Sequence, residues 1–381
     1  MTGEIPKHWK IKRLGEIGVF FKGKGVPKDK ITDTGFKCLT YGDLYTKYDF
    51  VIEGVKSFID KETALISQEI RYGDICFAGS GETLEDIGKC ATFIDDEIGY
   101  AGGDIIVFRT EQNPIVMSYL LNSDIAKKQK FSMGQGHSVV HIYSSQLEKL
   151  KLPFPPLEEQ EKIAEILLTC DKAIRLTTQI INQLKQRNQG LSQQLLTGEK
   201  NWKKSVLKNI AKIKKGEQLN VLNLNNKYKY PSYSGGITPS GYTDKYNTEK
   251  DTIIISEGGN SCGYINFIQE NFWSGGHCYS IVNSSISKDI NKMFLFYFLK
   301  KNQEEIMRLR VGSGLPNIQK RDIELFEIEY PPLANQNAIA QILDTVHQEL
   351  KLYEQKLQLL QAQKKTLMQK LLTGEVLTIK K

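Results

Sequence analysis

The chain has 381 residues, of which 40% are hydrophobic and 25% charged, and it carries a formal net charge of +7 at pH 7. This length predicts two or more domains, and the hydrophobic content is enough for packed cores, which argues against a disordered chain. No apolar run approaches the roughly 18 residues of a membrane span, and the N-terminus lacks the hydrophobic segment of a signal peptide, so we expect a protein of the cell interior.

The first globular segment, residues 1–154, mixes short strands with helix. Apolar pieces such as 75–77 and 104–108 are separated by glycine-rich turns, a pattern typical of strands. We expect one helix near 114–130 and a further strand-like piece at 147–154. The segment has 20 Lys and Arg against 21 Asp and Glu, so it can bind an acidic partner only if its positive charges gather on one face.

Residues 155–199 predict one long helix. Pro155 and Pro156 suit its first turn and bar a helix upstream, whereas Gly198 is typical of a helix end. The apolar residues between them follow a heptad repeat, which favours a coiled coil. One core position is polar, Asn188. The predicted apolar core residues are Ile163, Leu167, Ile174, Ile181, Leu184, Leu191 and Leu195.

The second globular segment, residues 200–330, repeats the plan of the first more weakly. Trp9, Leu14, Ile17, Lys22 and Gly23 recur as Trp202, Leu207, Ile210, Lys215 and Gly216. A helix near 293–309 corresponds to the one near 114–130, and a glycine-rich turn follows in both segments. The second segment is basic, with 19 Lys and Arg against 13 Asp and Glu, which allows an acidic partner.

Residues 331–375 repeat residues 155–199 without a gap, with 19 identities in 45 positions, so the chain is a tandem duplication. Lys364 is polar at the core position that corresponds to Asn188. The predicted apolar core residues of this second helix are Ile339, Leu343, Val346, Leu350, Leu357, Leu360, Leu367 and Leu371. A helix of about 38 residues is roughly 57 Å long, so the two helices are expected to pack on each other.

The predicted fold is therefore α+β, with two globular domains joined by two long antiparallel coiled-coil helices in a pseudo-two-fold tandem duplication. The expected boundaries are 1–154, 155–199, 200–330 and 331–381. Two modules related by a two-fold axis suit a partner that has a dyad itself, such as duplex DNA. A seven-periodic surface helix is the alternative, and the shared phase of both copies disfavours it.

This layout resembles the specificity subunit of a type I restriction–modification system. The strongest motifs are 152–163 with 195–199 in the first half and 330–339 with 371–375 in the second. The second copy has Asn335-Gln336 where the family usually has Glu-Gln. Weaker similarities lie in two further segments, 5–9 and 312–318.

The resemblance implies a non-catalytic, DNA-binding subunit in the prokaryotic cytoplasm. Each target-recognition domain would read one half of a bipartite, asymmetric site in double-stranded DNA, and the helical regions would fix the spacer. The helices would also bind two DNA methyltransferase (M) subunits, and the complex would recruit restriction/translocase (R) subunits. No cofactor is expected in this chain, because S-adenosylmethionine, ATP and Mg²⁺ would be bound by the partner subunits.

The residues themselves predict no catalytic group and no metal site. The one Asn-Pro pair, Asn113-Pro114, lacks the Asn-Pro-Pro-Tyr pattern of adenine methyltransferases, and 79–83 lacks the lysine of a phosphate-binding loop. The six cysteines form no CxxC pair, which argues against zinc and against a disulfide framework. His137 and His141 have no carboxylate or cysteine patterned around them.

DNA contacts must then come from loops and basic helices, since phosphates bind Lys, Arg and Ser, and base edges bind Arg, Asn, Gln, Ser and Thr. The candidates in the first module are Ser80, Thr83, Lys127, Lys128, Lys130, Gln135, His137 and Ser138. The candidates in the second module are Tyr233, Ser234, Asn260, Arg308, Arg310, Ser313, Asn317, Gln319 and Lys320. For each residue, a solvated surface charge or a turn former remains the alternative.

Two other functions stay open at this stage. The first is a coiled-coil adaptor whose modules bind protein and read no DNA sequence. The second is an enzyme with a fused methylation activity, which the missing methyltransferase motif disfavours.

Overall fold

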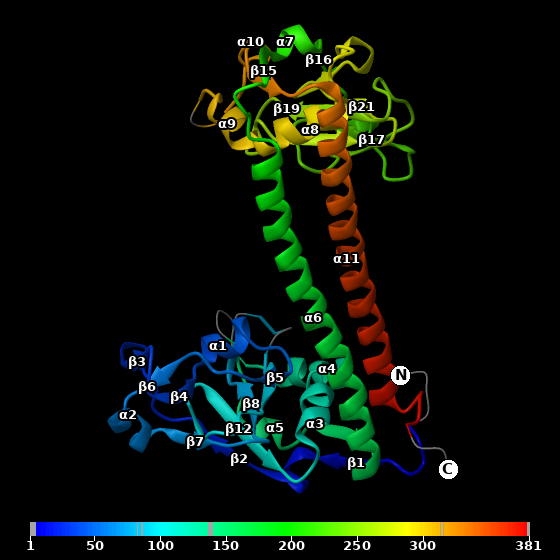
Figure 1. Cartoon of the computed structure of the whole chain (residues 1–381). Coiled ribbons are helices and arrows are strands. Elements are labelled where there is room, and N and C mark those ends of the chain that lie inside the picture. Colours follow the sequence, from blue (N-terminus) through cyan, green and yellow to red (C-terminus); the bar gives the residue numbers. More distant parts are fainter. Residues whose placement is uncertain are drawn as a thin grey trace. The chain divides into compact units, whose positions relative to one another are not determined.

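The computed structural model describes residues 5–81, 83–84, 87–135, 140–312, 314 and 316–378 (Figure 1). It contains two compact units, residues 1–176 with 357–381 and residues 177–356. Each unit combines one globular module with a segment of each long helix. The architecture is α+β in two similar units, which confirms the predicted fold class.

The first module is built on two five-stranded sheets with strand orders β2-β12-β8-β10-β5 and β3-β6-β4-β11-β7. The pairs β1-β14 and β13-β9 complete it. Its strands are β1 (Lys10–Arg13), β2 (Gly18–Lys22), β3 (Ile31–Thr32), β4 (Phe36–Leu39), β5 (Val51–Ile52), β6 (Phe58–Ile59), β7 (Gln68–Ile70), β8 (Ile75–Ala78), β9 (Ser80–Gly81), β10 (Cys90–Phe93), β11 (Gly99–Ala101), β12 (Ile105–Thr110), β13 (Val140–His141) and β14 (Lys151–Phe154). Its helices are η1 (Leu14–Glu16), η2 (Lys28–Lys30), α1 (Tyr41–Thr46), α2 (Lys61–Ile66), α3 (Pro114–Leu121), α4 (Asp124–Met133) and α5 (Ser144–Leu147).

The second module is a smaller version of the same plan. Its sheets have the orders β16-β22-β19-β20 and β18-β17-β21, and β15 pairs with β23. Its strands are β15 (Lys203–Val206), β16 (Ile213–Lys215), β17 (Tyr230–Tyr233), β18 (Gly241–Thr243), β19 (Thr252–Ser256), β20 (Ile265–Ile268), β21 (Trp273–Ser274), β22 (Cys278–Ile281) and β23 (Glu327–Tyr330). Its helices are α7 (Leu207–Ile210), η3 (Val221–Asn223), η4 (Asn283–Ser285), α8 (Lys292–Lys301), α9 (Gln303–Arg308) and α10 (Lys320–Glu324).

The helices expected near 114–130 and 293–309 are each broken into two. Asn122 ends α3 and its side-chain amide donates to the Cys90 carbonyl at 2.6 Å, while Ser123 caps α4. Asn302 lies between α8 and α9 and its amide donates to the Phe298 carbonyl at 2.9 Å. A short polar side chain that bonds to nearby backbone groups can end a helix. The two asparagines were therefore signals of helix ends, and the sequence-based prediction did not use them. The strand expected at 147–154 is also shorter, because Leu147 ends α5.

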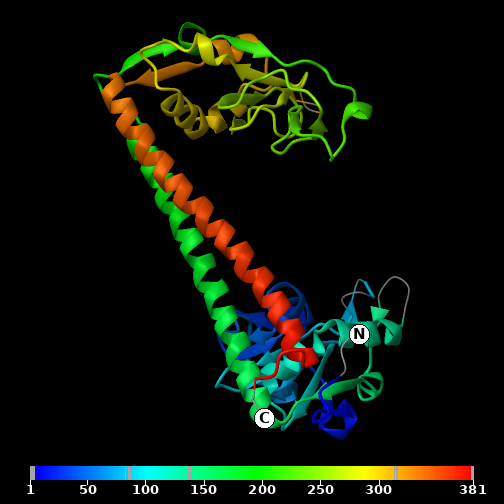
Figure 2. The same cartoon turned by 90° about the vertical axis from the view of Figure 1, so that its right-hand side faces the viewer.

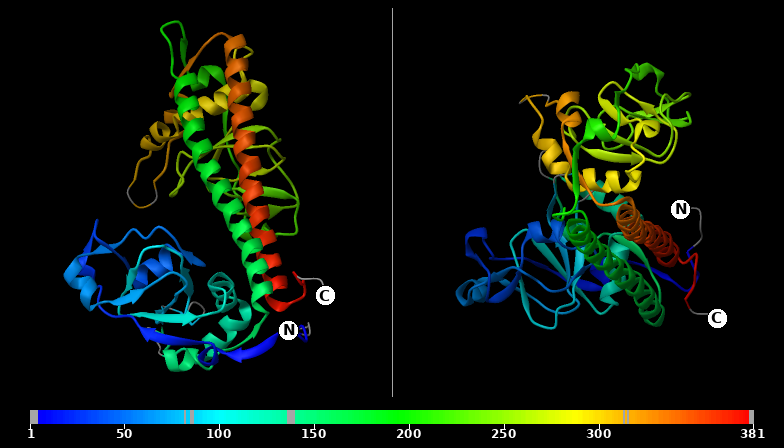
Figure 3. Two further views of the ribbon diagram at one scale, coloured as in Figure 1. Left: turned by 60° about the horizontal axis from the view of Figure 1, so that its bottom comes forward. Right: turned by 45° about the horizontal axis from the view of Figure 1, so that its top comes forward.

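The two long helices are α6 (Leu157–Leu195) and α11 (Leu333–Thr373). In the second unit, Lys185 contacts Glu354 at 2.9 Å, and Asn188 donates to the Val346 carbonyl at 2.9 Å. In the first unit, Lys364 pairs with Asp171. Residue numbers rise along α6 as they fall along α11, so the helices run antiparallel and side by side within each unit (Figures 2 and 3).

None of the fifteen predicted core residues is exposed. Ile163, Leu167 and Leu371 join the core of the first unit, and Leu343 joins that of the second. Gly374 follows α11 with a φ of 74°, as a helix-ending glycine does. Gly198 lies three residues beyond the end of α6 instead, where a Cβ would clash with the Glu329 carboxylate.

A buried glutamine in the first turn of each long helix joins that helix to its module. In the first unit, Gln160 accepts from the Asn113 backbone N–H at 2.9 Å and donates to Gln112 and to the Pro155 carbonyl. In the second unit, Gln336 accepts from the Asn291 N–H at 2.9 Å and donates to the carbonyls of Asp289 and Pro331. The side chain is almost fully buried in both units, at 1% and 0% exposure.

The neighbouring position differs between the helices, and the structure gives the reason. Glu159 is buried and accepts from the Trp9 indole at 2.9 Å, with His8 at 3.0 Å. The corresponding Asn335 is exposed. The second unit instead packs Trp202 against Phe294, with ring centroids 5.9 Å apart. The departure of Asn335 from Glu-Gln therefore leaves the anchoring glutamine in place.

We predict that Gln336→Leu destabilises the second unit. The substitution leaves the buried Asn291 N–H and two carbonyls without partners, at a cost of about 2 kcal/mol. For a unit of this size, thermal unfolding should shift down by about 6 °C, which calorimetry can measure. Gln341→Leu, at an exposed position of the same helix, is the matched control. An equal shift in both variants would contradict the anchoring role.

Candidate nucleic-acid interface

In each module, the two end residues of one segment, 135–141 or 311–317, exchange a pair of backbone hydrogen bonds, and these segments are called the hairpin loops. In the first module, Gln135 and His141 exchange two such bonds, of 2.9 and 2.7 Å. In the second module, Val311 and Asn317 do the same, at 2.8 and 3.0 Å. The two glycine-rich turns noticed in the sequence are therefore the same structural feature.

Both hairpin loops are bonded to the segment that directly follows an inner strand of a sheet, β8 in the first module and β19 in the second. In the first module, Ile142 N–H donates to the Gly79 carbonyl at 2.9 Å, and Ser80 pairs with His141. In the second, Ile318 N–H donates to the Glu257 carbonyl at 2.9 Å, and Gly258 bridges to Asn317. Glycine is needed at Gly312 and Gly259, which have φ values of 102° and 77°.

In the first module, some of the candidate residues are exposed and others are buried. Gln135 and Thr83 are exposed, whereas Ser80 is buried with its hydroxyl 3.2 Å from His141 Nδ1. Lys127 and Lys128 are exposed on α4. His137 and Ser138 lie outside the described residues.

Lys130 is not available for a phosphate contact, contrary to expectation. Its side chain is 1% exposed, and its ammonium donates to the Gly88 carbonyl at 2.6 Å. Burial lowers the pKa of this ammonium. Lys130 therefore stabilises the turn at Gly88 by a hydrogen bond. Its position in a lysine-rich helix did not distinguish a buried lysine from a solvated one.

In the second module, the exposed candidates flank the hairpin loop on both sides. Those that are exposed are Arg308, Arg310, Asn260, Gln319 and Lys320. Lys320 lies 3.4 Å from Glu324, one helical turn further on in α10. Asn317 is half-buried, and its Oδ1 has no hydrogen-bond partner within the described part of the chain. Ser313 lies outside the described residues.

Tyr233 and Ser234 are half-buried rather than presented on the surface. The Tyr233 ring packs edge-on against Phe272, with centroids 5.9 Å apart, and burial raises the pKa of its hydroxyl. Tyr233 therefore packs against the interior of the module. Its place in a glycine-rich stretch of the sequence did not predict this burial.

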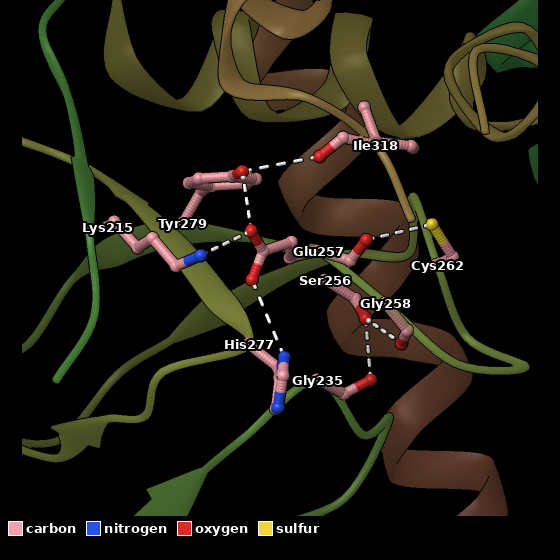
Figure 4. A network of polar contacts seen from close by, with 9 residues as sticks. All are labelled: Lys215, Gly235, Ser256, Glu257, Gly258, Cys262, His277, Tyr279 and Ile318. Carbon is pink, nitrogen blue, oxygen red and sulfur yellow. Dashed lines mark hydrogen bonds and ion pairs between the residues drawn. The ribbon is translucent and has the colours of Figure 1, made fainter. Parts of the chain in front are cut away.

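Glu257 has a role that its sequence pattern did not predict. This residue directly follows the buried strand β19 and is itself buried, with Lys215 Nζ at 2.6 Å and the Tyr279 hydroxyl at 2.8 Å from its Oε1 (Figure 4). Burial and the bond to Glu257 raise the pKa of Tyr279. A charged residue directly after an apolar strand was the available signal.

Two general properties bear on what the interface can do. Over the residues that the structure describes, no helix is both long and apolar enough to span a membrane. Over the same residues, no cluster of three or more His, Cys, Asp or Glu side chains could hold a metal ion.

Comparison with known proteins agrees with the repeated layout. Residues 6–186 and 199–362 match the model of the family described as type I restriction modification DNA specificity domain. The putative type I restriction enzyme MjaX specificity subunit of Methanocaldococcus jannaschii is 27% identical, over 98% of this chain and 95% of the relative. A putative type I specificity subunit of Mycoplasma genitalium is 36% identical over 39% of each chain.

Solved structures show the same fold. The crystal structure of a type I restriction–modification S subunit from M. genitalium aligns with a TM-score of 0.71 at 20% identity, covering 98% of this chain and 97% of the other. A chain from a study of type I restriction–modification complex assembly aligns with a TM-score of 0.58 at 18% identity, covering 98% of this chain and 100% of the other. With the family match covering both halves, the chain belongs to the type I restriction–modification DNA specificity (S) subunits.

Proposed function

We propose that this S subunit reads a bipartite DNA site, one half with each module, and that its paired helices fix the spacer and dock methyltransferase subunits. The observation that carries the proposal is the duplicated hairpin loop. Residues 135–141 and 311–317 have the same backbone closure but different side chains. The same backbone closure with two different sets of polar side chains suits the recognition of two different base sequences.

The exposed basic and amide side chains of each module suit contacts of both kinds. Lys127 and Lys128 on α4, with Arg308 and Arg310 near α9, suit phosphates. Gln135, Asn260 and Gln319 suit base edges. The exposed residues Leu352 and Leu359 on α11 suit a protein partner.

In this proposal the chemistry belongs to the partners. Specificity subunits are non-catalytic in general, and the methyl donor S-adenosylmethionine would be bound by the methyltransferase subunits. ATP and Mg²⁺ would be bound by restriction/translocase subunits. This chain would contribute sequence recognition and spacing.

The decisive measurement is base-resolution methylation sequencing of DNA from cells that co-express this chain and its cognate methyltransferase. We expect one adenine-methylated motif of two parts with a fixed gap, absent when this chain is omitted. If the two proteins bind each other but no motif appears, and the complex shows no salt-sensitive DNA binding, the protein is a coiled-coil adaptor instead.

A second prediction tests the spacer role of the helices. Seven residues are inserted between Leu176 and Thr177 and another seven between Lys356 and Leu357, so that the heptad phase is kept in both helices. One heptad adds roughly 10 Å, or about three base pairs at 3.4 Å each. The methylated motif should keep both half-sites and gain a spacer of that size. An unchanged spacer would rule out the helices as the ruler.

A third prediction concerns the exposed lysines of α4. The variant Lys127→Ala/Lys128→Ala should weaken DNA binding by the assembled complex without changing the motif, because phosphate contacts carry no sequence information. The slope of log K against log salt should fall in magnitude by about 2. Titrations by fluorescence anisotropy at several salt concentrations measure it.

The matched control is Lys28→Ala/Lys30→Ala, which removes the same charge from exposed positions of η2 in the same module. Its slope should equal that of the unsubstituted protein. An equal loss of slope in both variants would show a diffuse charge effect rather than contacts at α4.

A further inference from the structure

A buried carboxylate lies beneath the loops of the second module. Glu257 is 4% exposed. Its Oε1 contacts Lys215 Nζ at 2.6 Å and the Tyr279 hydroxyl at 2.8 Å, while its Oε2 faces His277 Nδ1 at 3.6 Å (Figure 4). Oε2 has no hydrogen bond within the described part of the chain. Side chains from three other positions of the module therefore meet at one carboxylate.

The first module has glycine at the corresponding place. Gly79 N–H donates to the Asp104 carbonyl and the Gly79 carbonyl accepts from Ile142 N–H, at 2.8 and 2.9 Å. Glu257 makes the same two backbone bonds, to His277 and from Ile318, at 2.9 Å each. The backbone position is thus common to both modules, but the carboxylate cluster belongs to the second alone.

The cluster reaches one neighbouring loop through the Tyr279 hydroxyl, and separate hydrogen bonds close the two loops beside it. The Tyr279 hydroxyl is 2.8 Å from Glu257 Oε1 and 3.2 Å from the Ile318 carbonyl, so it lies between Glu257 and the residue that follows segment 311–317 and can donate to either oxygen. The thiol of Cys262 donates to the Glu257 carbonyl at 3.0 Å, which closes loop 256–262. The hydroxyls of Ser256 and Ser261 both donate to the carbonyl of Gly235, which holds loop 233–236.

This arrangement is costly for a purely structural role. Removing a carboxylate from water is unfavourable before its partners compensate, and well-packed apolar residues often stabilise a fold as well or better. Buried polar clusters instead specify one arrangement of the groups around them. The groups around Glu257 are the loops that carry Asn260 and Asn317, which are candidates for base contacts.

We propose that Glu257 is a positioning residue that fixes the segment carrying Asn317 in the second module and thereby sets the base preference of one half-site only. This inference rests on the proposed function. The hydroxyl of Tyr279 transmits the effect to hairpin loop 311–317. The first module achieves its own arrangement without such a carboxylate, so its half-site is independent of Glu257.

The test compares methylation motifs in cells that co-express the methyltransferase with the unsubstituted chain, Glu257→Gln or Tyr279→Phe. Glu257→Gln keeps the shape of the side chain but loses the charge that pairs with Lys215. Tyr279→Phe removes only the hydroxyl. In both variants, methylation of near-cognate second half-sites should rise about tenfold relative to cognate sites, within the discrimination that one base contact carries. The first half-site and the spacer should stay unchanged.

Tyr297→Phe is the matched control. Tyr297 lies on α8 of the same unit, is buried, and points its hydroxyl at Asp344 3.3 Å away, away from the three loops. It should leave the motif unchanged. Calorimetry on all the purified complexes checks that the variants fold.

The possible outcomes separate the two proposals. If the unsubstituted chain yields no bipartite motif, the proposed function fails. If it yields one and both cluster variants keep the same second half-site, Glu257 has no positioning role. The positioning role is also contradicted if both half-sites relax together, or if Tyr297→Phe relaxes the second half-site as much as Tyr279→Phe does.

Discussion

The buried glutamine in the first turn of each long helix is the constraint on which the rest of each unit depends. A side-chain amide supplies one acceptor and two donor hydrogens, and Gln160 and Gln336 each use both kinds of group within a nearly water-free site. The acceptor meets the N–H at the start of α3 or α8, and the amide group donates both to the carbonyl of the proline before the long helix and to a second group of the module, Gln112 or the Asp289 carbonyl. The module and the helix are thereby joined at a fixed place, which explains why this glutamine is identical in both copies while the modules have diverged.

The long helices could be predicted well because their signal is local. Heptad spacing, proline starts and the repeated ending define them without knowledge of any distant contact, and the observed helices match the expected ranges closely. The breaks at Asn122 and Asn302 were missed because apolar residues continue on both sides of them. Asn122 and Asn302 each donate to the carbonyl four residues earlier, a local signal that the apolar pattern outweighed.

The candidate interface was harder to predict, since it depends on contacts between segments far apart in the chain. Lys130 and Lys128 look alike in sequence, yet one is buried under Gly88 and the other is exposed. Glu257 differs from Gly79 by a side chain whose partners lie on β16 and β22, and its place directly after an apolar strand does not reveal those partners. For both Lys130 and Glu257, the sequence does not show whether the polar group faces solvent or a partner. Tertiary burial decides this.

The polar residue at the core of the paired helices finds a different partner in each unit. In the first unit, Lys364 pairs with Asp171 and lies over the rings of Phe50 and Tyr119, at 4.3 and 5.0 Å from their centroids. In the second unit, Asn188 donates to the Val346 carbonyl instead. A slip of one heptad would leave Lys364 without its carboxylate in a mostly buried position, and an unpaired buried charge costs several kcal/mol. Each polar residue therefore opposes a change of register in its own unit, and a fixed register is what a pair of helices needs if its length is to set the spacing of a DNA site.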